Sequence, residues 1–274
     1  MNICKKIFLG EVEAFELGYG PIGPPLMNVF FYYVDGLLID TGQSLMKRTF
    51  NDLIEHKKIA KVVLTHHHED HSGNAAEVIR SKAVPVYGHP MTVRKLSEGF
   101  NILPYQRIIW GPAPRAELLP VPGSIETDKY RFEAIHTPGH SRDHMVYLEK
   151  SRGWLFSGDL FLGPRIKFFR ADEKFDDEIE SLRKVSRLDF DSLFCSVRPQ
   201  VTRGREMIGK KLEYLENLYG EIRSYVEKGR TDAEIMRRYR GREARFVKYI
   251  TFGNVSYKNM IRSALAAART AAAE

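Results

Sequence analysis

Two kinds of hydrophobic spacing alternate along the first 200 residues of the chain. Short apolar runs typical of strands occupy residues 28–34 and 37–39, and the pair Asp35-Gly36 between them favours a two-residue hairpin turn. The segments expected next are a helix at 50–56, a strand at 62–64, a helix at 75–80 and strands at 84–87, 130–135, 145–148 and 154–157. This order predicts an α/β fold in which two mixed sheets lie between outer helices.

Beyond residue 200 the hydrophobic spacing becomes helical. Apolar residues recur three or four positions apart at Ile208, Leu212, Leu215, Tyr219, Ile222 and Val226. Gly229 can end this helix, Thr231 and Glu234 form the pattern of a capping box, and Ser256 can start a last helix. We therefore predict an α/β domain at 1–200 and a helical C-terminal extension at 201–274.

Length and composition are those of a folded intracellular protein. A chain of 274 residues with 43% hydrophobic residues can bury a sizeable core. The apolar stretch at 1–9 is too short for a secretory signal, and no run approaches the roughly 20 apolar residues of a membrane span. The cysteines, Cys4 and Cys195, lie far apart and give no disulfide framework. We expect a cytoplasmic protein without a membrane partner.

The charge is unevenly distributed along the chain. Residues 201–274 contain 16 Lys and Arg against 9 Asp and Glu, whereas residues 1–200 contain 26 of each, so the net charge of +7 lies in the extension. Such an excess is compatible with an ordinary solvated helical surface. It is also compatible with a patch for a phosphate-bearing partner, such as RNA or a coenzyme A tail, and 237–242 is then its most basic stretch.

The strongest chemical signal is the segment T-H-H-H-E-D-H-S-G-N at 65–74, directly after the apolar run 62–64. Imidazole and carboxylate groups are the ligands that Zn²⁺ and similar divalent ions prefer. Alternate side chains of an extended segment point the same way, so His66 and His68 can share one ion. The turn that follows carries Asp70 and His71 toward a neighbouring one. The spacing therefore predicts two adjacent ion positions.

Two later segments supply further ligands, each just past an apolar strand. The stretch 135–141 reads I-H-T-P-G-H-S and contains His140, and 155–160 reads L-F-S-G-D-L and contains Asp159. With these three segments the chain, from about 28 to 199, resembles the metallo-β-lactamase superfamily, whose pattern is H-x-H-x-D-H, a His after T-P-G and an Asp after S-G.

The resemblance implies a fold and a set of ligands. The fold would be an αββα sandwich with its metals at one edge. The first ion would be held by His66, His68 and His140, the second by Asp70 and His71, and Asp159 would bridge the two.

One expected ligand is missing. The family usually provides a last histidine in a G-H-x-P-like loop, but the chain has no histidine after His144, and its matching loop at 194–199 reads F-C-S-V-R-P. Counting back from Pro199 puts Val197 in the ligand's place, with Arg198 as the next alignment, and neither side chain can ligate a metal. We expect one tightly bound ion, zinc with iron or manganese as alternatives, and a weakened or degenerate second site.

Other candidate residues are expected to support the site or to lie outside it. Asp40, in a segment that resembles the family's L-I-D-T-G, is expected to orient the metal-binding loop or to form a simple turn. His67 is expected to face away from the ligands, and His144 to support the site or the fold. The glycine-rich stretch 18–25 is interpreted as a loop over the site. The histidines expected outside the site are His56, His89 and His136.

The expected chemistry is hydrolysis. A metal held by three imidazoles lowers the pKa of bound water from 15.7 toward about 7 and polarises a substrate oxygen, so no organic cofactor is needed. Asp70 would orient the hydroxide and take part in proton transfer. The leading hypothesis is a metal-dependent hydrolase of a small-molecule ester, thioester or lactam, similar in architecture to hydroxyacylglutathione hydrolases.

Two other functions stay open. The stretch 137–145, T-P-G-H-S-R-D-H-M, resembles a lactamase-like subgroup that includes endoribonucleases and carries a helical C-terminal extension, so single-stranded RNA is an alternative substrate. The insertion of the larger nucleic-acid nucleases is absent. The missing histidine also fits a mononuclear iron oxygenase or a catalytically degenerate relative.

Overall fold

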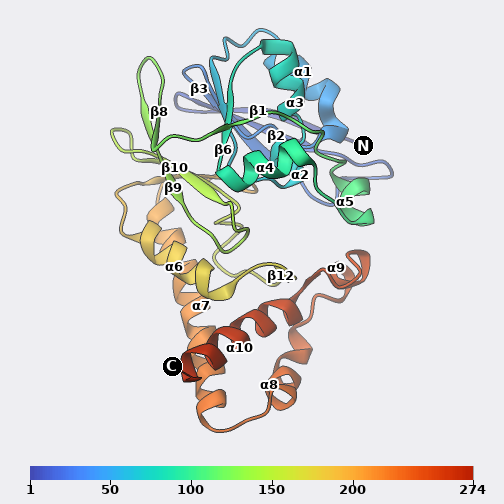
Figure 1. The fold of residues 1–274 in the computed structure, drawn as a ribbon, viewed down its shortest axis with the longest axis vertical. Coiled ribbons are helices and arrows are strands. Elements are labelled where there is room, and N and C mark those ends of the chain that lie inside the picture. The colour runs from blue at the N-terminus through green and yellow to red at the C-terminus, as the bar shows by residue number, and fades with distance from the viewer. Residues whose placement is uncertain (274) are drawn as a thin grey trace.

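The computed structural model describes residues 1–273, in which two sheets pack face to face with helices on both outer sides (Figure 1). The first sheet is antiparallel from β1 to β4 and parallel from β4 to β7. Its strands, which follow chain order, are β1 (Ile3–Leu9), β2 (Val12–Gly18), β3 (Val29–Val34), β4 (Leu37–Ile39), β5 (Lys61–Val63), β6 (Val86–Gly88) and β7 (Leu119–Pro120).

The second sheet has the strand order β13-β11-β10-β9-β8, with β11 and β13 parallel and the other pairs antiparallel. Its strands are β8 (Ser124–Glu126), β9 (Arg131–His136), β10 (Met145–Glu149), β11 (Trp154–Gly158) and β13 (Ser192–Cys195). A separate antiparallel ladder joins β12 (Phe169–Arg170) to β14 (Val255–Ser256). This ladder ties the C-terminal helices to the loop that follows β11.

The helices of the sandwich are η1 (Ser44–Met46), α1 (Lys47–Ile54), α2 (Glu69–Ser72), α3 (Ala75–Lys82), α4 (Pro90–Glu98), α5 (Pro104–Ile109) and α6 (Phe175–Ser186). Those after residue 200 are α7 (Gly204–Glu227), α8 (Asp232–Tyr239), η2 (Arg240–Arg242), α9 (Arg245–Ile250) and α10 (Tyr257–Ala273).

Among residues 1–273, no helix combines the length and hydropathy needed to cross a bilayer.

Three hydrophobic clusters hold the layers together. The cluster between the sheets includes Tyr32 from the first sheet and Tyr147 and Phe156 from the second. Another packs α1, α3 and α4 on the outer face of the first sheet, around Phe50. The third covers the outer face of the second sheet. This arrangement is the predicted α/β sandwich with outer helices.

The C-terminal helices belong to that third cluster. Val146 and Leu155 of the second sheet pack there together with Ile208, Leu215 and Ile222 of α7. The stripe predicted for this helix therefore packs into the cluster, although its Leu212 and Tyr219 are only partly buried. The boundary drawn at residue 200 marks a change in secondary structure, and the hydrophobic core continues across it.

Several local signals in the sequence have the predicted structural meaning. Asp35 and Gly36 both have positive φ, 45° and 82°, as a tight hairpin turn between β3 and β4 requires. Thr231 and Glu234 form a capping box at the start of α8. Ser256 accepts a hydrogen bond from the backbone N–H of Asn259 at 3.1 Å and caps α10.

Candidate metal centre

The candidate ligands converge at one edge of the sandwich because the strands that carry them end there. The parallel strands β4 and β5 are followed by Asp40 and by the segment 65–71. His140 lies in the loop between β9 and β10, and Asp159 directly follows β11. By the register of β2, β3 and β4, the glycine-rich loop at 18–25 leaves the first sheet at this same edge; its role as a cover stays a prediction.

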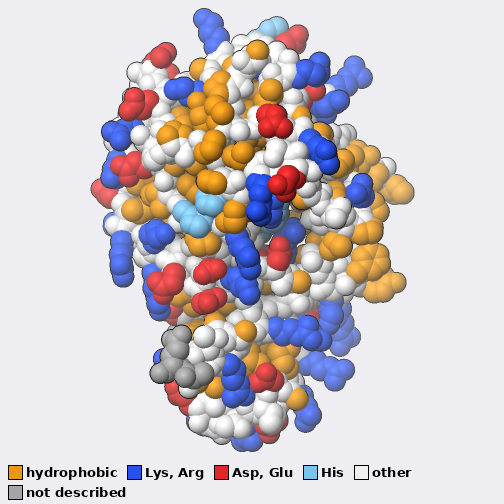
Figure 2. Space-filling view, viewed as in Figure 1, with side chains coloured by type: hydrophobic (Ala, Val, Ile, Leu, Met, Phe, Trp, Pro, Cys, Tyr) orange, Lys and Arg blue, Asp and Glu red, His pale blue; other side chains and the backbone are white. Residues whose placement is uncertain are grey.

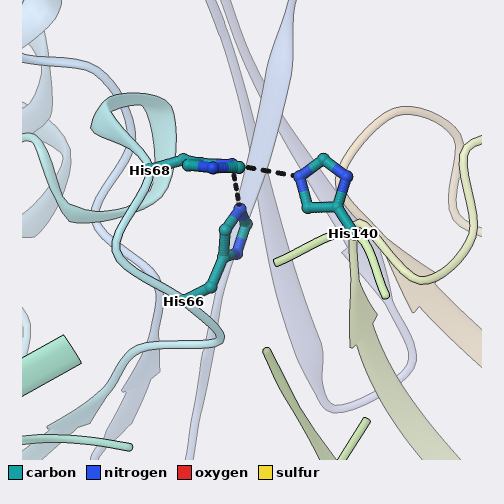
Figure 3. Close-up of side chains that lie close together, drawn as sticks. All are labelled: His66, His68 and His140. Carbon is teal, nitrogen blue, oxygen red and sulfur yellow. Dashed lines mark hydrogen bonds between the residues drawn. The ribbon is translucent and has the colours of Figure 1, made fainter. Parts of the chain in front are cut away.

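Three imidazoles point toward one another (Figure 3). Nδ1 of His68 lies 2.8 Å from Nε2 of His66 and 3.0 Å from Nε2 of His140. All three side chains are buried. A tetrahedral Zn²⁺ with bonds of about 2.0–2.1 Å separates its nitrogen ligands by roughly 3.3 Å, so small shifts would seat an ion between them.

Asp159 links this trio to a second group of side chains. One carboxylate oxygen lies 3.2 Å from Nε2 of His140, and the other lies 3.2 Å from Nε2 of His71. Asp70 also approaches His71, with 3.7 Å between its Oδ2 and that same nitrogen. The structure thus brings together all the ligands predicted from the sequence, with Asp159 between the two groups.

The protonation of these residues fits a cation site. Burial lowers the pKa of His66 and of His68 well below the usual value and leaves both imidazoles neutral. Burial alone would lower the pKa of His140, but Asp159 and Glu173 raise it to about 9. Carboxylates that stabilise a proton on a metal-free imidazole also attract a divalent cation, which can bind the imidazole once that proton has left.

The second group also contains an unsatisfied donor or acceptor. Nε2 of His71 is buried and makes no well-aligned hydrogen bond to any residue in the described part of the chain. Burial alone would lower the pKa of His71, but Asp70, Asp159 and Asp40 raise it well above its usual value. Burial, with Asp159 and Glu69, raises the pKa of Asp70 to about 7, although His71 opposes this. A buried carboxyl of this kind can exchange a proton near neutral pH.

Asp40 orients the metal-binding loop, as the sequence suggested. Its carboxylate accepts hydrogen bonds from the backbone N–H of Thr65 at 2.7 Å and from the Thr65 hydroxyl at 2.8 Å. It also lies 2.8 Å from Nδ1 of His71. With Nδ1 donating to Asp40, Nε2 of His71 is the nitrogen that faces Asp159.

Glu173 orients His140 in the same way, although the sequence did not predict this role. Its Oε1 lies 3.4 Å from Nδ1 of His140 and also accepts a hydrogen bond from the backbone N–H of Arg170 at 3.0 Å. Glu173 follows β12, so the β12–β14 ladder positions it. No motif surrounds this residue, and its contact with His140 arises only in the folded chain.

We expect Glu173→Gln to weaken metal binding by about 10- to 100-fold, because the carboxylate that orients and polarises His140 is lost. Competition with a chromogenic chelator measures the affinity. The neighbouring Asp172→Asn, which removes a carboxylate that pairs with Arg170 and is 60% exposed, is the matched control and should bind metal nearly normally. Equal affinities of the two variants would contradict a role for Glu173.

His67 faces away from the ligands, as predicted, but it enters a buried polar network. Its Nδ1 lies 2.9 Å from the Asp143 carboxylate, which also accepts from the backbone N–H of His67 at 3.0 Å and from the Thr92 hydroxyl at 2.7 Å. Lys95 Nζ lies 2.8 Å from the other ring nitrogen. This network fixes the backbone between His66 and His68.

His144 supports the site without entering it. Its Nε2 accepts a hydrogen bond from the backbone N–H of Asp159 at 3.2 Å, so Nδ1 carries the proton and donates to Thr137 Oγ1 at 2.9 Å. Burial, with nearby His140, lowers the pKa of His144 to about 3, which keeps this imidazole neutral.

The remaining histidines lie outside the ligand groups. His89 accepts a hydrogen bond from the backbone N–H of Met91 at the start of α4 and stacks on His136, with ring centroids 4.6 Å apart. His136 ends β9, and His56 is solvent-exposed.

The loop after β13 brings Ser196, and not Val197, beside the candidate ligands. Val197 is 42% exposed, whereas Ser196 is buried and its hydroxyl hydrogen-bonds the Asp159 carboxylate. Ser196 is also fixed by its backbone carbonyl, which accepts from the N–H of Phe30 at 2.7 Å. The structure therefore favours Ser196 over Val197 for the missing ligand's place, because the loop turns Val197 outward.

Ser196→His should therefore strengthen binding of a second ion, since an imidazole would replace the hydroxyl beside Asp159. Val197→His adds the same group one residue away, on an exposed side chain, and should leave the second binding step unchanged. Calorimetric metal titration of both variants measures this. A gain in Val197→His alone would restore the original alignment.

Comparison with known proteins agrees with this geometry. A family model described as the metallo-beta-lactamase superfamily matches residues 26–197. The chain is 30% identical over 153 residues to an atrochrysone carboxyl ACP thioesterase from Passalora fulva, covering 53% of this chain and 40% of the relative. It is 27% identical over 141 residues to a hydroxyacylglutathione hydrolase from Bdellovibrio bacteriovorus, covering 50% and 49%. The aligned segments thus span half or less of these curated relatives.

The fold is shared with solved structures. A metallo-beta-lactamase family protein from Thermus thermophilus superposes with a TM-score of 0.60 at 20% identity, covering 77% of this chain and 82% of that one. The matching family model covers well over half of the chain and includes all six candidate ligands. The chain therefore belongs to the metallo-beta-lactamase superfamily.

Proposed function

We propose that the protein is a metal-dependent hydrolase of small-molecule thioesters that works with one ion at His66, His68 and His140. The observation that carries this proposal is the convergence of three buried imidazole nitrogens beside the carboxylates of Asp70 and Asp159. The relative named as an ACP thioesterase supports the thioester among the ester, thioester and lactam substrates considered above.

The proposed ion is zinc, for which three imidazoles are a common catalytic ligand set. When bound, such an ion supplies a water of lowered pKa and polarises the substrate carbonyl. Asp70 would hold the attacking water and move its proton toward the leaving sulfur. Asp159 orients the imidazole of His140, and Ser196 in turn holds Asp159 in place through its hydroxyl. The free thiols of Cys4 and Cys195 support action in the reducing cytoplasm.

A chelation experiment tests the proposal. Protein stripped of metal is assayed with an acyl thioester, the matching oxygen ester, a β-lactam and a single-stranded RNA, before and after addition of Zn²⁺, Fe²⁺ or Mn²⁺. We expect thioester hydrolysis to disappear on chelation and to return with zinc. Cleavage of RNA without hydrolysis of any small substrate would establish the endoribonuclease alternative. Recovery only with iron, together with oxygen consumption, would establish the oxygenase.

A further inference from the structure

A pocket lies in the helical part of the molecule, and none of the candidate metal ligands lines it. Helices α8, α9 and α10 enclose a pocket of about 1210 Å³, here called the helical pocket. The cations that line it are Arg237, Arg240, Arg245, Lys248 and Lys258. Five of the 16 Lys and Arg of residues 201–274 thus line one concave site, a gathering that an evenly solvated helical surface would not require.

Most of this charge is not neutralised by the protein. Glu243 is the one acidic residue among residues 1–273 that lines the pocket. It accepts hydrogen bonds from the backbone N–H groups of Tyr257 and Lys258 and lies 3.5 Å from Lys248 Nζ. In residues 1–273, no carboxylate lies within ion-pair distance of the other four cations. These are Arg237, Arg240, Arg245 and Lys258. Like charges gathered without partners favour binding of a ligand with several anionic groups, and guanidinium groups match phosphate geometry well.

Aromatic side chains stand at the rim of the same pocket. Tyr249 is 83% exposed and Phe252 is 80% exposed, and both line the pocket. Figure 2 shows hydrophobic side chains projecting at the right-hand side of the molecule, over α9, with Lys and Arg side chains gathered below them. Exposed aromatic faces next to cations suit a ligand that carries both a planar ring and phosphates.

A short strand pair connects the helical pocket to the metal centre. β14 lies between the pocket residues of α9 and those of α10, and it pairs with β12. Glu173, three residues beyond β12, contacts His140. The hydroxyl of Tyr105 on α5 also donates to Asn254 Oδ1 at 2.6 Å, which ties the segment after α9 to the sandwich. A ligand with its anionic head in the pocket and its reactive group at the metal would have to reach from helices α8 to α10 to the edge of the sandwich (Figure 1).

We infer that the helical pocket binds the phosphorylated adenine nucleotide of coenzyme A, so that the pantetheine arm carries an acyl thioester toward the metal centre. Coenzyme A combines the required parts: several phosphates, a planar base and a long flexible arm that ends in sulfur. The acyl group at the metal rests on the proposed function, whereas nucleotide binding in the pocket does not. A single-stranded RNA is the less favoured occupant because the five cations and two exposed aromatic residues named here all line one pocket.

Calorimetric titration of the purified full chain with coenzyme A, 3′-phosphoadenosine 5′-phosphate and pantetheine tests the inference without turnover. Coenzyme A and the nucleotide should bind, and pantetheine should not. Arg237→Ala with Arg240→Ala should weaken coenzyme A binding by about tenfold per side chain, which corresponds to about 1.4 kcal/mol each. Arg223→Ala with Arg262→Ala, which removes two exposed arginines outside the pocket, is the matched control and should bind normally.

The outcomes separate this inference from the proposed function. If coenzyme A binds as predicted but thioesters are not hydrolysed, the pocket assignment stands and the proposed function is wrong. If small thioesters are hydrolysed but coenzyme A does not bind, or binds equally to the pocket variant and the control, the pocket assignment is wrong. Tighter, steeply salt-dependent binding of a single-stranded oligoribonucleotide that the pocket variant loses would also overturn it.

Discussion

His68→Ala is expected to lose bound metal and hydrolytic activity together. His68 is the central member of the trio, because its Nδ1 lies within 3.0 Å of both other imidazoles. Loss of a residue that merely orients a ligand costs up to about 100-fold in affinity or activity, so loss of the ligand itself should exceed that. Metal content by elemental analysis and thioester turnover measure the two effects.

The fold should survive this change. The hydrogen bonds of the His68 ring that the structure records are those to the other two site histidines, and its Nε2 is buried without a partner among the described residues. His56→Ala removes a solvent-exposed histidine and serves as the control, with normal metal content expected. A His68→Ala protein that keeps both its metal and its turnover would show that these histidines are not the ligands.

Lys211→Met should destabilise the protein more than any other change considered. Lys211 on α7 and Glu178 on α6 form an ion pair of 2.5 Å, and both side chains are only 2% exposed. Lys211 Nζ also donates to the carbonyl of Leu160, the residue after Asp159, at 2.6 Å. Removing one partner of a buried pair leaves a charge without compensation, and we expect a loss of about 3–5 kcal/mol in the free energy of unfolding.

The double variant Lys211→Met with Glu178→Leu is the control, because two apolar side chains of similar size often replace a buried pair at little cost. It should recover most of the loss. Burial raises the pKa of Glu178, so in the single variant the carboxyl can take up a proton as the pH falls. The stability deficit should therefore shrink at acidic pH. Chemical denaturation that shows less than about 1 kcal/mol of difference at neutral pH would refute this account of the pair.

The site residues that could be predicted from the sequence are those that lie in short, recognisable motifs. The segment 65–71 carries its four candidate ligands within a few residues, and His140 and Asp159 each follow a strand that the sequence predicted. Glu173 and Ser196 were missed because their contacts depend on the path of two loops in the folded chain. Glu173 is positioned by the pairing of Phe169 with Ser256.

The same distinction applies to the fold. The stripe on α7 predicted a helix, but its partner, the outer face of the second sheet, could not be read from the spacing. Lys211 interrupts that stripe as a buried cation, and its role becomes visible only with Glu178 beside it. The strand β1 was not predicted because it lies at the edge of its sheet and leaves Lys5, Lys6 and Phe8 exposed, so it lacks a clear apolar face.

Stepwise addition of Zn²⁺ to metal-free protein, with bound metal and thioester hydrolysis measured at each step, tests the central claim most directly. If the three-histidine site carries the activity and the second site is depleted, hydrolysis should rise in proportion to bound zinc and level off at one ion per chain. Any further ion should bind weakly and add little. Activity that appears only when two ions are tightly bound, or that is unaffected by the metal, would contradict the account.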